Sequence, residues 1–275
     1  MVGPLDSERT LDLDPGDRVA PAKAFAAGFT IGHFRVVREL GAGGMGIVFE
    51  AYDPDLDRKV AIKVVRGRDA STEAGARLIR EAQAMARLAH PNVVAVHEVG
   101  TIEGEVFLVM ELVPGETLAL WLETPRPWRE IVGAFVQAGD GLAAAHAAGL
   151  IHRDFKPTNV LVDHAGRVRV GDFGLAREDD FELAKGSERL VAGTPGYMAP
   201  EQRVGDPVDA RADQYAFAVS LQQALRKAPK VPRRIRAALQ RALAIDPDDR
   251  YPSMHELLGE LRHALSNRRR IVAAI

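Results

Sequence analysis

The sequence contains no cysteine among its 275 residues, so disulfide bonds, thiolate catalysis and cysteine-ligated zinc sites are excluded. A chain without thiols is compatible with a reducing compartment, and we expect it to be cytoplasmic. No apolar run approaches the roughly 20 residues that span a bilayer. The N-terminus also lacks the basic and then apolar order of a signal peptide. We therefore expect neither a membrane span nor export.

An excess of charge of one sign is also missing, because the formal net charge is −2 and the pI is about 6.5. This balance gives no electrostatic reason to expect a nucleic acid as partner. Hydrophobic residues make up 47% of the chain. That share is enough for a large core and excludes a chain that is disordered throughout.

What the sequence does contain is a dense group of polar side chains between His152 and Asn159, followed by Asp172. Asp154 can accept a proton from a hydroxyl group, and Lys156 can balance the charge of a phosphoryl group in transfer. Asn159 and Asp172 offer oxygen atoms, the ligands that magnesium prefers. A solvated polar loop is the plain alternative for each residue alone. The spacing of the whole set favours phosphate and metal chemistry.

This spacing, H-R-D-x-x-x-x-N at 152–159 with D-F-G at 172–174 and A-P-E at 199–201, resembles the catalytic core of protein kinases. The resemblance covers about residues 30–266 and is to bacterial-type (Hanks-type) serine/threonine kinases. It implies an α+β, bilobal fold with a small β-rich lobe, one main helix in that lobe, and a larger, mainly helical lobe. It also implies a transferase that moves the γ-phosphoryl group of ATP to protein hydroxyl groups, with Mg²⁺ or Mn²⁺ as the metal.

Changes in composition and periodicity along the chain predict where the two lobes and the terminal segments begin and end. Residues 1–29 mix Asp, Pro, Gly and Ala without sustained periodicity, which is typical of a flexible leader. We expect the small lobe at 30–110, the hinge and large lobe at 111–266, and a basic tail at 267–275.

A glycine-rich stretch lies between two strand-like runs, Phe34–Leu40 and Ile47–Tyr52. A dinucleotide fingerprint would need a helix after the glycines, and a β-branched run follows instead. The resemblance implies that this loop covers the ATP phosphates, because glycines let backbone amides approach closely. The implied nucleotide-binding residues are Gly41, Ala42, Gly43, Gly44, Met45, Gly46, Val48, Ala61, Lys63, Met110, Glu111, Val113 and Leu161. Among them Met110 is the gatekeeper, Glu111 and Val113 bond adenine, and Leu161 closes the pocket from below.

Lys63 lies in an apolar run, where an unpaired ammonium group would be costly, so it needs a carboxylate. The helix predicted at 71–88 places Glu81 on the same face as Leu78 and Met85. An exposed Glu81 paired with Arg77 is the alternative without the family context. With that context we expect an ion pair between Lys63 and Glu81, and count both as catalytic with Asp154 and Lys156.

The resemblance also implies a regulated segment between Asp172 and Glu201. Thr194 is expected to bond beside Asp154 and Lys156, a pattern similar to serine/threonine kinases. Arg153 beside the catalytic aspartate is expected to bind a phosphate, for which Ser187 is the main candidate site.

One region departs from the family. Asp213 is expected to open the buried helix that anchors the catalytic loop, and Arg250 to pair with Glu201. Between these points, residues 227–231 join two helices where kinases normally place another helix and long loops. The large lobe is therefore shortened, and we expect an apolar surface on the anchoring helix to be less covered. The ATP site should survive this better than recognition of the protein substrate does.

Three functions follow, in order of preference. The first is a serine/threonine protein kinase that autophosphorylates, with a dimer as the arrangement for that reaction. The second is a nucleotide-binding pseudokinase or scaffold, which only the missing helix favours. The third, a small-molecule phosphotransferase of similar fold, is opposed by the segment 193–201, which resembles the substrate-binding segment of protein kinases.

Overall fold

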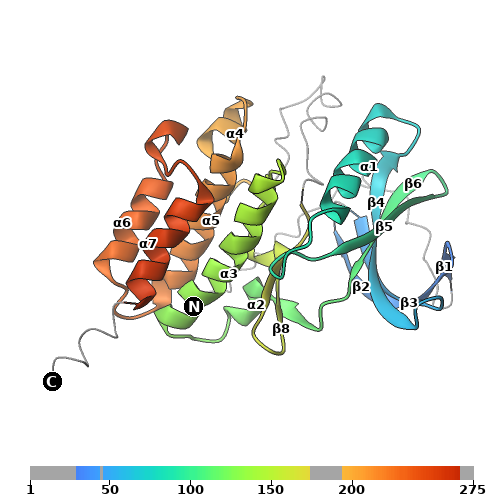
Figure 1. The fold of residues 1–275 in the computed structure, drawn as a ribbon, viewed down its shortest axis with the longest axis horizontal. Helices are drawn as coiled ribbons and strands as arrows, with labels where there is room; N and C mark the ends of the chain where they lie inside the picture. Colours follow the sequence, from blue (N-terminus) through green and yellow to red (C-terminus); the bar gives the residue numbers. More distant parts are fainter. Residues whose placement is uncertain (1–28, 44–45, 174–193, 267–275) are drawn as a thin grey trace, which may run out of the picture.

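The computed structural model describes residues 29–43, 46–173 and 194–266. These residues form two lobes, one built on a curled sheet with helix α1 and one built mainly of helices (Figure 1). The predicted bilobal α+β fold is therefore confirmed. No helix among the described residues is long and apolar enough to cross a membrane.

The small lobe is a six-stranded sheet in the order β1-β2-β3-β4-β6-β5, with neighbouring strands antiparallel. Its strands are β1 (Thr30–Ile31), β2 (Phe34–Gly43), β3 (Gly46–Asp53), β4 (Arg58–Asp69), β5 (Val96–Ile102) and β6 (Glu105–Glu111). Because side chains alternate along a strand, Val60 and Ile62 of β4 belong to the core on one face of the sheet. Ala61 and Val65 belong to the second core on the other face, and Lys63 lies between them on that face.

Helix α1 (Glu73–Ala86) packs on that second face, against β4, β5 and β6. The hydroxyl of Thr72 caps it by accepting a hydrogen bond from the N–H of Gly75 at 3.1 Å. Leu78, Ala82 and Met85 are buried at helical spacing. The helix expected at 71–88 is thus confirmed, although it begins later, at Glu73, and ends earlier, at Ala86.

In the large lobe, α3 (Trp128–Ala147) packs against α5, α7 and strand β9. The other helices are α2 (Leu118–Trp121), α4 (Pro200–Val204), α5 (Ala210–Ala224), α6 (Arg233–Ala242) and α7 (Met254–Ser266). A small sheet of β7 (Gly115–Thr117), β8 (Val160–Asp163) and β9 (Val168–Val170) lies beside them. Short 3₁₀ turns are η2 (Pro157–Asn159), η4 (Leu225–Lys227) and η5 (Pro247–Asp249). Gly149 follows α3 with φ of +76°, the left-handed ending that its position predicts.

Three helix starts refine the sequence prediction. The expectation that Asp213 opens the anchoring helix is wrong, because Asp209 caps α5 by accepting from the N–H of Arg211 at 2.7 Å. Pro232 is the N-cap residue of α6 and not part of its first turn. Ser253 Oγ accepts from the N–H of Glu256 at 3.4 Å before α7, which is half of the capping box that the sequence Ser253-Met254-His255-Glu256 predicts.

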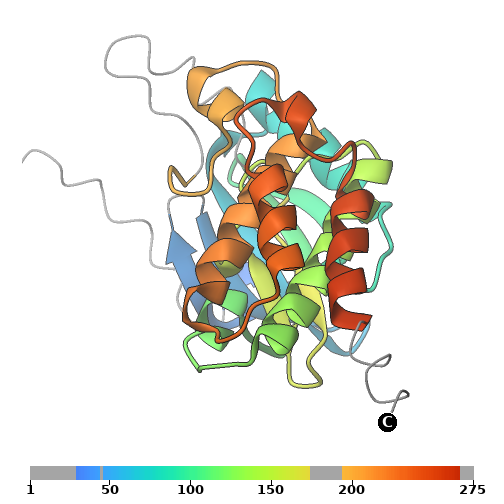
Figure 2. The ribbon, with the colours of Figure 1, turned by 90° about the vertical axis from the view of Figure 1, so that its left-hand side faces the viewer.

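The connection between α5 and α6 is short, as predicted. Only the turn η4 and residues 228–232 separate the two helices. Figure 2 shows α6 and α7 side by side on the face turned to the viewer, and the two helices are in contact. Within the described residues, no α-helix lies between α5 and α6, which is where kinases normally place another one.

Candidate active site

The backbone of the catalytic loop is held by Asp213, which lies on α5 and is fully buried. Its Oδ2 accepts from the N–H of His152 at 2.7 Å, and its Oδ1 accepts from the N–H of Arg153 at 2.7 Å. The ring Nε2 of His146, on α3, lies 2.8 Å from Oδ2. Burial raises the pKa of Asp213, but the hydrogen bond with His146 and the other donors outweigh it and lower that pKa. The carboxylate therefore stays charged and fixes the loop.

Asp154 is nearly buried and receives hydrogen bonds on both carboxylate oxygens. Oδ2 accepts from Lys156 Nζ at 2.7 Å and lies 3.3 Å from Nδ2 of Asn159. Oδ1 accepts from the N–H of Thr194 at 3.1 Å and from its hydroxyl at 3.2 Å. Lys156 Nζ also donates to the Thr194 hydroxyl at 2.6 Å. The expected contact of Thr194 with Asp154 and Lys156 is confirmed, and it aligns a carboxylate beside an ammonium group.

The catalytic loop and the D-F-G stretch are joined through Gly171. Its N–H donates to the carbonyl of Asn159 at 2.9 Å, and its carbonyl lies 2.9 Å from Nε2 of His152. The rings of His152 and Phe173 are 4.7 Å apart at their centroids. Asp172 follows with φ of +54°, a left-handed conformation in which its carboxylate meets Lys63. His152 therefore has a structural role, because its ring links the catalytic loop to Gly171 and Phe173.

Lys63 Nζ pairs with Asp172 Oδ1 at 2.8 Å, and the Lys63 side chain is 5% exposed. The prediction that Lys63 pairs with Glu81 is therefore wrong, because its partner is Asp172. The physical requirement was right, since a buried ammonium group needs a carboxylate. The partner is different because Asp172 stands at the end of β9 and reaches Lys63 across the two lobes. Glu81 lies half-buried on α1 and lines a cavity with Met85 and Phe173.

The expected adenine-binding residues lie on strands that the register places together. Val48 stands opposite Lys63, and Ala61 stands opposite Met110. Val48 and Leu161 are only partly buried, whereas Ala61 and Met110 are buried. A Cβ at Gly46, where φ is +142°, would overlap the carbonyl oxygen of Val64, so no side chain fits there. Gly44, Met45 and Gly174 lie outside the described residues.

The hinge after β6 is held by contacts that the sequence analysis missed. The N–H of Glu111 donates to the carbonyl of Ala95 at 2.9 Å. Arg169 on β9 lies 3.5 Å from Glu111 Oε1 and donates to Asp163 Oδ2 at 3.0 Å. Nothing in the spacing of these residues shows that they meet, because each comes from a different strand. The N–H of Glu111 is occupied, which leaves its carbonyl and the backbone of Val113 for a base.

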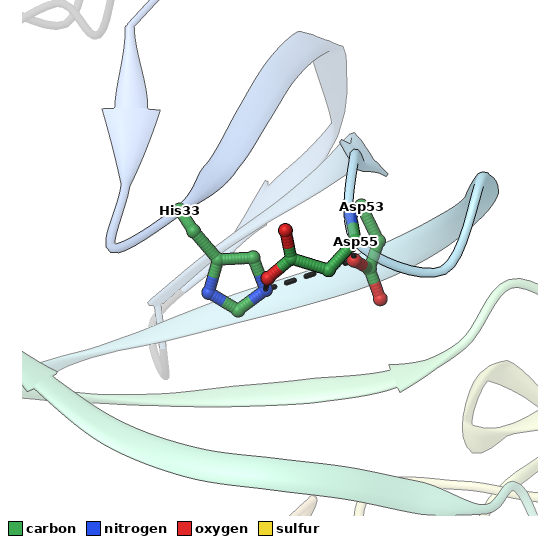
Figure 3. A group of neighbouring side chains, drawn as sticks. All are labelled: His33, Asp53 and Asp55. Carbon is green, nitrogen blue, oxygen red and sulfur yellow. Dashed lines mark hydrogen bonds and ion pairs between the residues drawn. The ribbon is translucent and has the colours of Figure 1, made fainter.

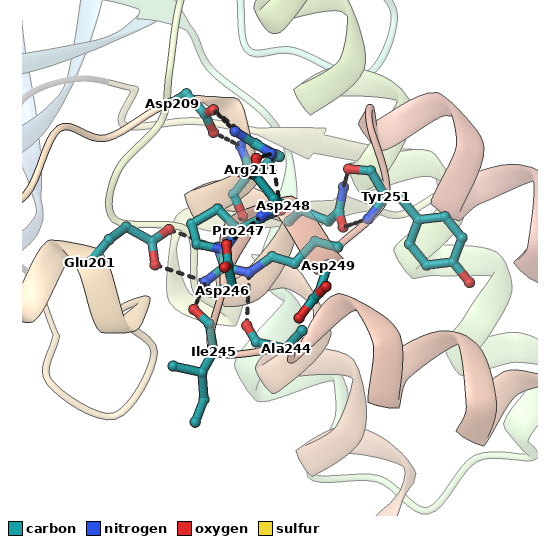
Figure 4. A network of polar contacts seen from close by, with 12 residues as sticks. Glu201, Asp209, Arg211, Ala244, Ile245, Asp246, Pro247, Asp248, Asp249 and Tyr251 are labelled. Carbon is teal, nitrogen blue, oxygen red and sulfur yellow. Dashed lines mark hydrogen bonds and ion pairs between the residues drawn. The ribbon is translucent and has the colours of Figure 1, made fainter.

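Arg250 joins α4 to the segment before α7, as expected from its pairing with Glu201 (Figure 4). The two Nη nitrogens of Arg250 donate to the two Glu201 oxygens at 2.7 Å, and the arginine side chain is fully buried. It also donates to the carbonyls of Ala244, Ile245 and Arg211. The bidentate geometry is the strong form of a charged hydrogen bond. It fixes the end of the segment that carries Thr194.

A model of the protein kinase domain matches residues 34–264. The chain belongs to the protein kinase family. It is 34% identical to the serine/threonine-protein kinase Pkn1 of Myxococcus xanthus, over 93% of this chain and 41% of that protein. It is 39% identical to PknF of Mycobacterium tuberculosis, over 71% of this chain and 43% of that protein. The chain thus spans about two fifths of the length of these relatives.

The kinase domain of PknI from Mycobacterium tuberculosis has a similar solved structure. The TM-score is 0.73 with 30% sequence identity, and the match covers 88% of this chain and all of that domain. The resemblance to bacterial serine/threonine kinases, stated above from the motifs, is therefore confirmed.

Beside the catalytic loop of this kinase domain, a cavity of about 300 Å³ is lined by Arg77, Arg80 and Arg153. Among the side-chain atoms of the described residues, Nη1 of Arg153 is buried without a hydrogen-bond partner. The carbonyl of Arg153 accepts from Gln202 at 2.8 Å, and its φ is +65°. The same cavity is also lined by Glu81, and Arg77 pairs with Glu73 at 3.0 Å. The buried Nη1 of Arg153 is a free donor that could bind an anion. Ser187 lies outside the described residues.

A second group of titratable residues lies on the small lobe, away from the motifs. His33 Nε2 is 3.7 Å from both Asp53 Oδ1 and Asp55 Oδ2, and the three side chains point toward one another (Figure 3). Asp53 already accepts from the N–H groups of Asp55 and Leu56 and from Arg58. These bonds close the turn between β3 and β4, so the group has a structural explanation.

Proposed function

We propose that this kinase domain transfers the γ-phosphoryl group of ATP to serine and threonine hydroxyl groups of proteins. The observation that carries the proposal is the set of contacts around Asp154. Its carboxylate is held by Lys156, Asn159 and Thr194 on a loop that Asp213 fixes from below. Catalysis of phosphoryl transfer depends on such positioning and charge stabilisation.

Each side chain around Asp154 has a separate role in this proposal. Asp154 aligns the substrate hydroxyl and accepts its proton as the oxygen attacks phosphorus. Lys156 balances negative charge on the phosphoryl group in transfer. Thr194 keeps the Asp154 carboxylate and the Lys156 ammonium group aligned, and it holds the substrate-binding segment next to them. Its two bonds to Asp154 support this role.

The residues around the cleft fit ATP and a divalent metal. Nδ2 of Asn159 donates to the carbonyl of Asp154 at 2.8 Å, so Oδ1 is the atom that this amide offers to a cation. Asp172 offers a second oxygen, and the hydrogen bond from Gly171 to Asn159 keeps the two residues adjacent. When bound, the metal neutralises charge on the phosphates. We propose Mg²⁺, with Mn²⁺ as a substitute, since carboxylate and amide oxygens suit both ions.

Nucleotide binding is proposed for the walls of the cleft. The backbone from Gly41 to Gly46 covers the phosphates, Val48 and Ala61 lie above adenine, and Leu161 lies below it. Met110, Glu111 and Val113 form the inner edge. The partial exposure of Val48 and Leu161 supports this assignment.

Lys63 is proposed to orient the α- and β-phosphates, and Glu81 to hold Lys63 when nucleotide and metal are bound. A metal that binds Asp172 would compete with its ion pair to Lys63, because both cations would draw on the charge of one carboxylate. Glu81 already faces the cavity between α1 and the catalytic loop. In this proposal Lys63 pairs with Asp172 in the present structure and changes to Glu81 when nucleotide and metal bind.

Regulation is proposed to act through Arg153. A phosphate on Ser187 would pair with the unpartnered Nη1 of Arg153 in the cavity that Arg77 and Arg80 also line. Ser187→Ala should then lower activity without changing ATP affinity. Unchanged autophosphorylation and activity in this variant would place the switch elsewhere.

Incubation of the purified chain with γ-labelled ATP and magnesium, followed by mapping of the labelled residues, tests the activity. Asp154→Asn should reduce transfer by at least about 100-fold, as expected for loss of a general base, while nucleotide binding persists. Asp206→Asn, at an exposed position of the same lobe, is the matched control and should transfer label normally. Equal labelling in the Asp154→Asn variant would refute the assignment.

The alternative, a nucleotide-binding pseudokinase, predicts binding of ATP with no transfer to any protein. The full motif set and the serine/threonine kinases among its relatives do not favour it. Autophosphorylation between two molecules is the finer expectation. In that case the rate per molecule should rise with protein concentration, whereas transfer within one molecule would leave it constant.

A further inference from the structure

Where the kinase domain lacks a helix, the surface between α5 and α6 carries a groove of about 600 Å³. Its apolar lining is Leu225, Ala228, Val231, Leu239 and Leu243, and its polar lining is Gln222, Arg226, Arg236 and Gln240. Ala228, Val231 and Leu243 are only partly buried. The groove thus exposes apolar side chains that a missing neighbour would otherwise cover.

The charge around this groove is of one sign. Residues 222–243 include seven arginines and lysines and no aspartate or glutamate. Arg226 and Arg236, both exposed, contribute directly to the lining. Long arginine side chains can cover apolar contacts with their methylene groups and place their charge at the edge. An apolar and acidic segment is therefore the complement of this surface.

The sequence before the small lobe contains such a segment. Residues 5–14, L-D-S-E-R-T-L-D-L-D, carry four acidic residues, one arginine and three leucines. In an extended chain, alternation places Leu11 and Leu13 on one side and Asp12 and Asp14 on the other. The C-terminal residues 267–275 also lie outside the described structure, but their three arginines would repel the basic groove.

We propose that residues 5–14 of the same molecule dock in the groove between α5 and α6, with their leucines on its apolar floor and their carboxylates at Arg226 and Arg236. The 14 residues from 15 to 28 separate this segment from Phe29. Fully extended they span about 45–50 Å, and Figure 1 places β1 and α6 at opposite ends of the long axis, so docking requires this linker to be nearly extended. A tethered segment of this kind acts at a local concentration of about 1 mM, so weak contacts suffice.

Hydrogen exchange of the 275-residue chain, followed by mass spectrometry, tests the contact. In the native chain, amides of 225–243 should exchange about tenfold more slowly than in the variant Asp12→Lys with Asp14→Lys, because docking restricts opening of the α5–α6 connection. Asp17→Lys, which makes the same type of charge change outside the segment, should leave this exchange unchanged. Diluting the native chain should not alter the protection.

A charge exchange separates direct contact from indirect effects. Arg226→Glu with Arg236→Glu should accelerate exchange of 225–243 as the leader variant does, whereas Arg87→Glu, at an exposed position of the small lobe, should not. Combining the leader and groove changes should restore slow exchange, since the charges are then complementary again.

Three results would overturn the proposal. If the leader variant exchanges like the native chain, the groove has another partner, such as the acidic stretch 178–182. If protection is lost on dilution, the occupant is the leader of a second copy and not of the same molecule. Failure of the combined variant to recover protection would equally rule out the contact.

Discussion

Asp213 shows how one buried carboxylate determines the geometry of a catalytic loop. Two adjacent backbone N–H groups and a histidine ring converge on its two oxygens. Those N–H groups belong to a segment in which Arg153 has a left-handed backbone, with φ of +65°. Such a conformation is costly for a residue other than glycine. The hydrogen bonds of Asp213 offset this cost.

Replacing Asp213 by asparagine tests this role. The amide retains one acceptor oxygen but directs an N–H₂ group at a backbone N–H, so at least one buried donor loses its partner. We expect the free energy of unfolding to fall by about 3 kcal/mol, measured by urea denaturation. The exposed Asp206→Asn control should change it by less than about 0.5 kcal/mol. Equal stability of the two variants would contradict the role assigned to Asp213.

Asp163, at the end of β8, gives a prediction about pH. A hydrogen bond from the N–H of Arg167 lowers its pKa, burial raises it, and Arg169 and Ala165 lower it further, to about 2 from 3.8. Because the folded-state pKa is depressed, the stabilising contribution is complete above the unfolded-state value and is lost as pH falls toward 2. The stability difference between the native chain and Asp163→Asn should therefore be constant at pH 5–7 and shrink below pH 4.

Chemical denaturation at a series of pH values measures that difference. Asp55→Asn, at an exposed turn of the small lobe, serves as control, and this variant should show no such pH dependence relative to the native chain. A difference that grew on acidification would have the wrong sign for a depressed pKa.

At the scale of elements, the position of α3 depends on two glycines that allow close contact. A Cβ at Gly141 would overlap the backbone carbonyl oxygen of Asn92, and a Cβ at Gly139 would overlap Leu258 of α7. At Gly133, on the same helix, a methyl group would have no atom within 4 Å of it. The same substitution on one helix should therefore have opposite effects at two sites.

Gly133→Ala should stabilise the domain by about 0.5–1 kcal/mol, because alanine is the better helix former. Gly141→Ala should destabilise it by about 1–3 kcal/mol, since the helix must move away from rigid backbone. Thermal or urea unfolding of both variants measures the contrast. Similar shifts for the two variants would mean that packing of α3 against residue 92 is not close.

The sequence predicted the catalytic loop and the helices well because their signals are local. The residues of this loop lie within one short segment, so contacts such as that of Lys156 with Asp154 form between near neighbours in the sequence. The pair of Glu201 with Arg250 was predictable only from family resemblance, since nothing else links positions 49 apart. The contacts of Arg169 with Glu111 and of His146 with Asp213 carried no signal. They form where separate elements meet, and no pattern in one segment records the other.

The partner of Lys63 was predicted wrongly for a different reason. Both Glu81 and Asp172 are acidic residues near the cleft, and sequence supplies both. Which of them binds depends on how the lobes and α1 are placed, and in this structure the partner is Asp172. That is a property of a state of the molecule and not of the sequence alone.

At the scale of the whole molecule, side-chain and backbone contacts connect the lobes across the cleft. Lys63 pairs with Asp172, and the N–H of Val94, which follows Val93, donates to the carbonyl of Val170. A ligand that binds both lobes should therefore stabilise the entire domain. At a concentration of ATP with Mg²⁺ about 100 times its dissociation constant, linkage adds about 2.7 kcal/mol. For a domain of this size that corresponds to a rise in Tm of about 5–10 °C.

Removing the metal should abolish most of this rise, because the proposed function has Asp172 and Asn159 act on the phosphates through the cation. Thermal unfolding with ATP plus magnesium, with ATP plus EDTA, and with adenosine separates the contributions. Asp172→Asn should lose the magnesium-dependent part and keep the shift from adenosine, which needs only the hinge and the apolar walls. Asp206→Asn should respond like the native chain. An equal ATP shift with and without magnesium would remove the metal role from Asp172, and no shift under any condition would remove the nucleotide from the cleft.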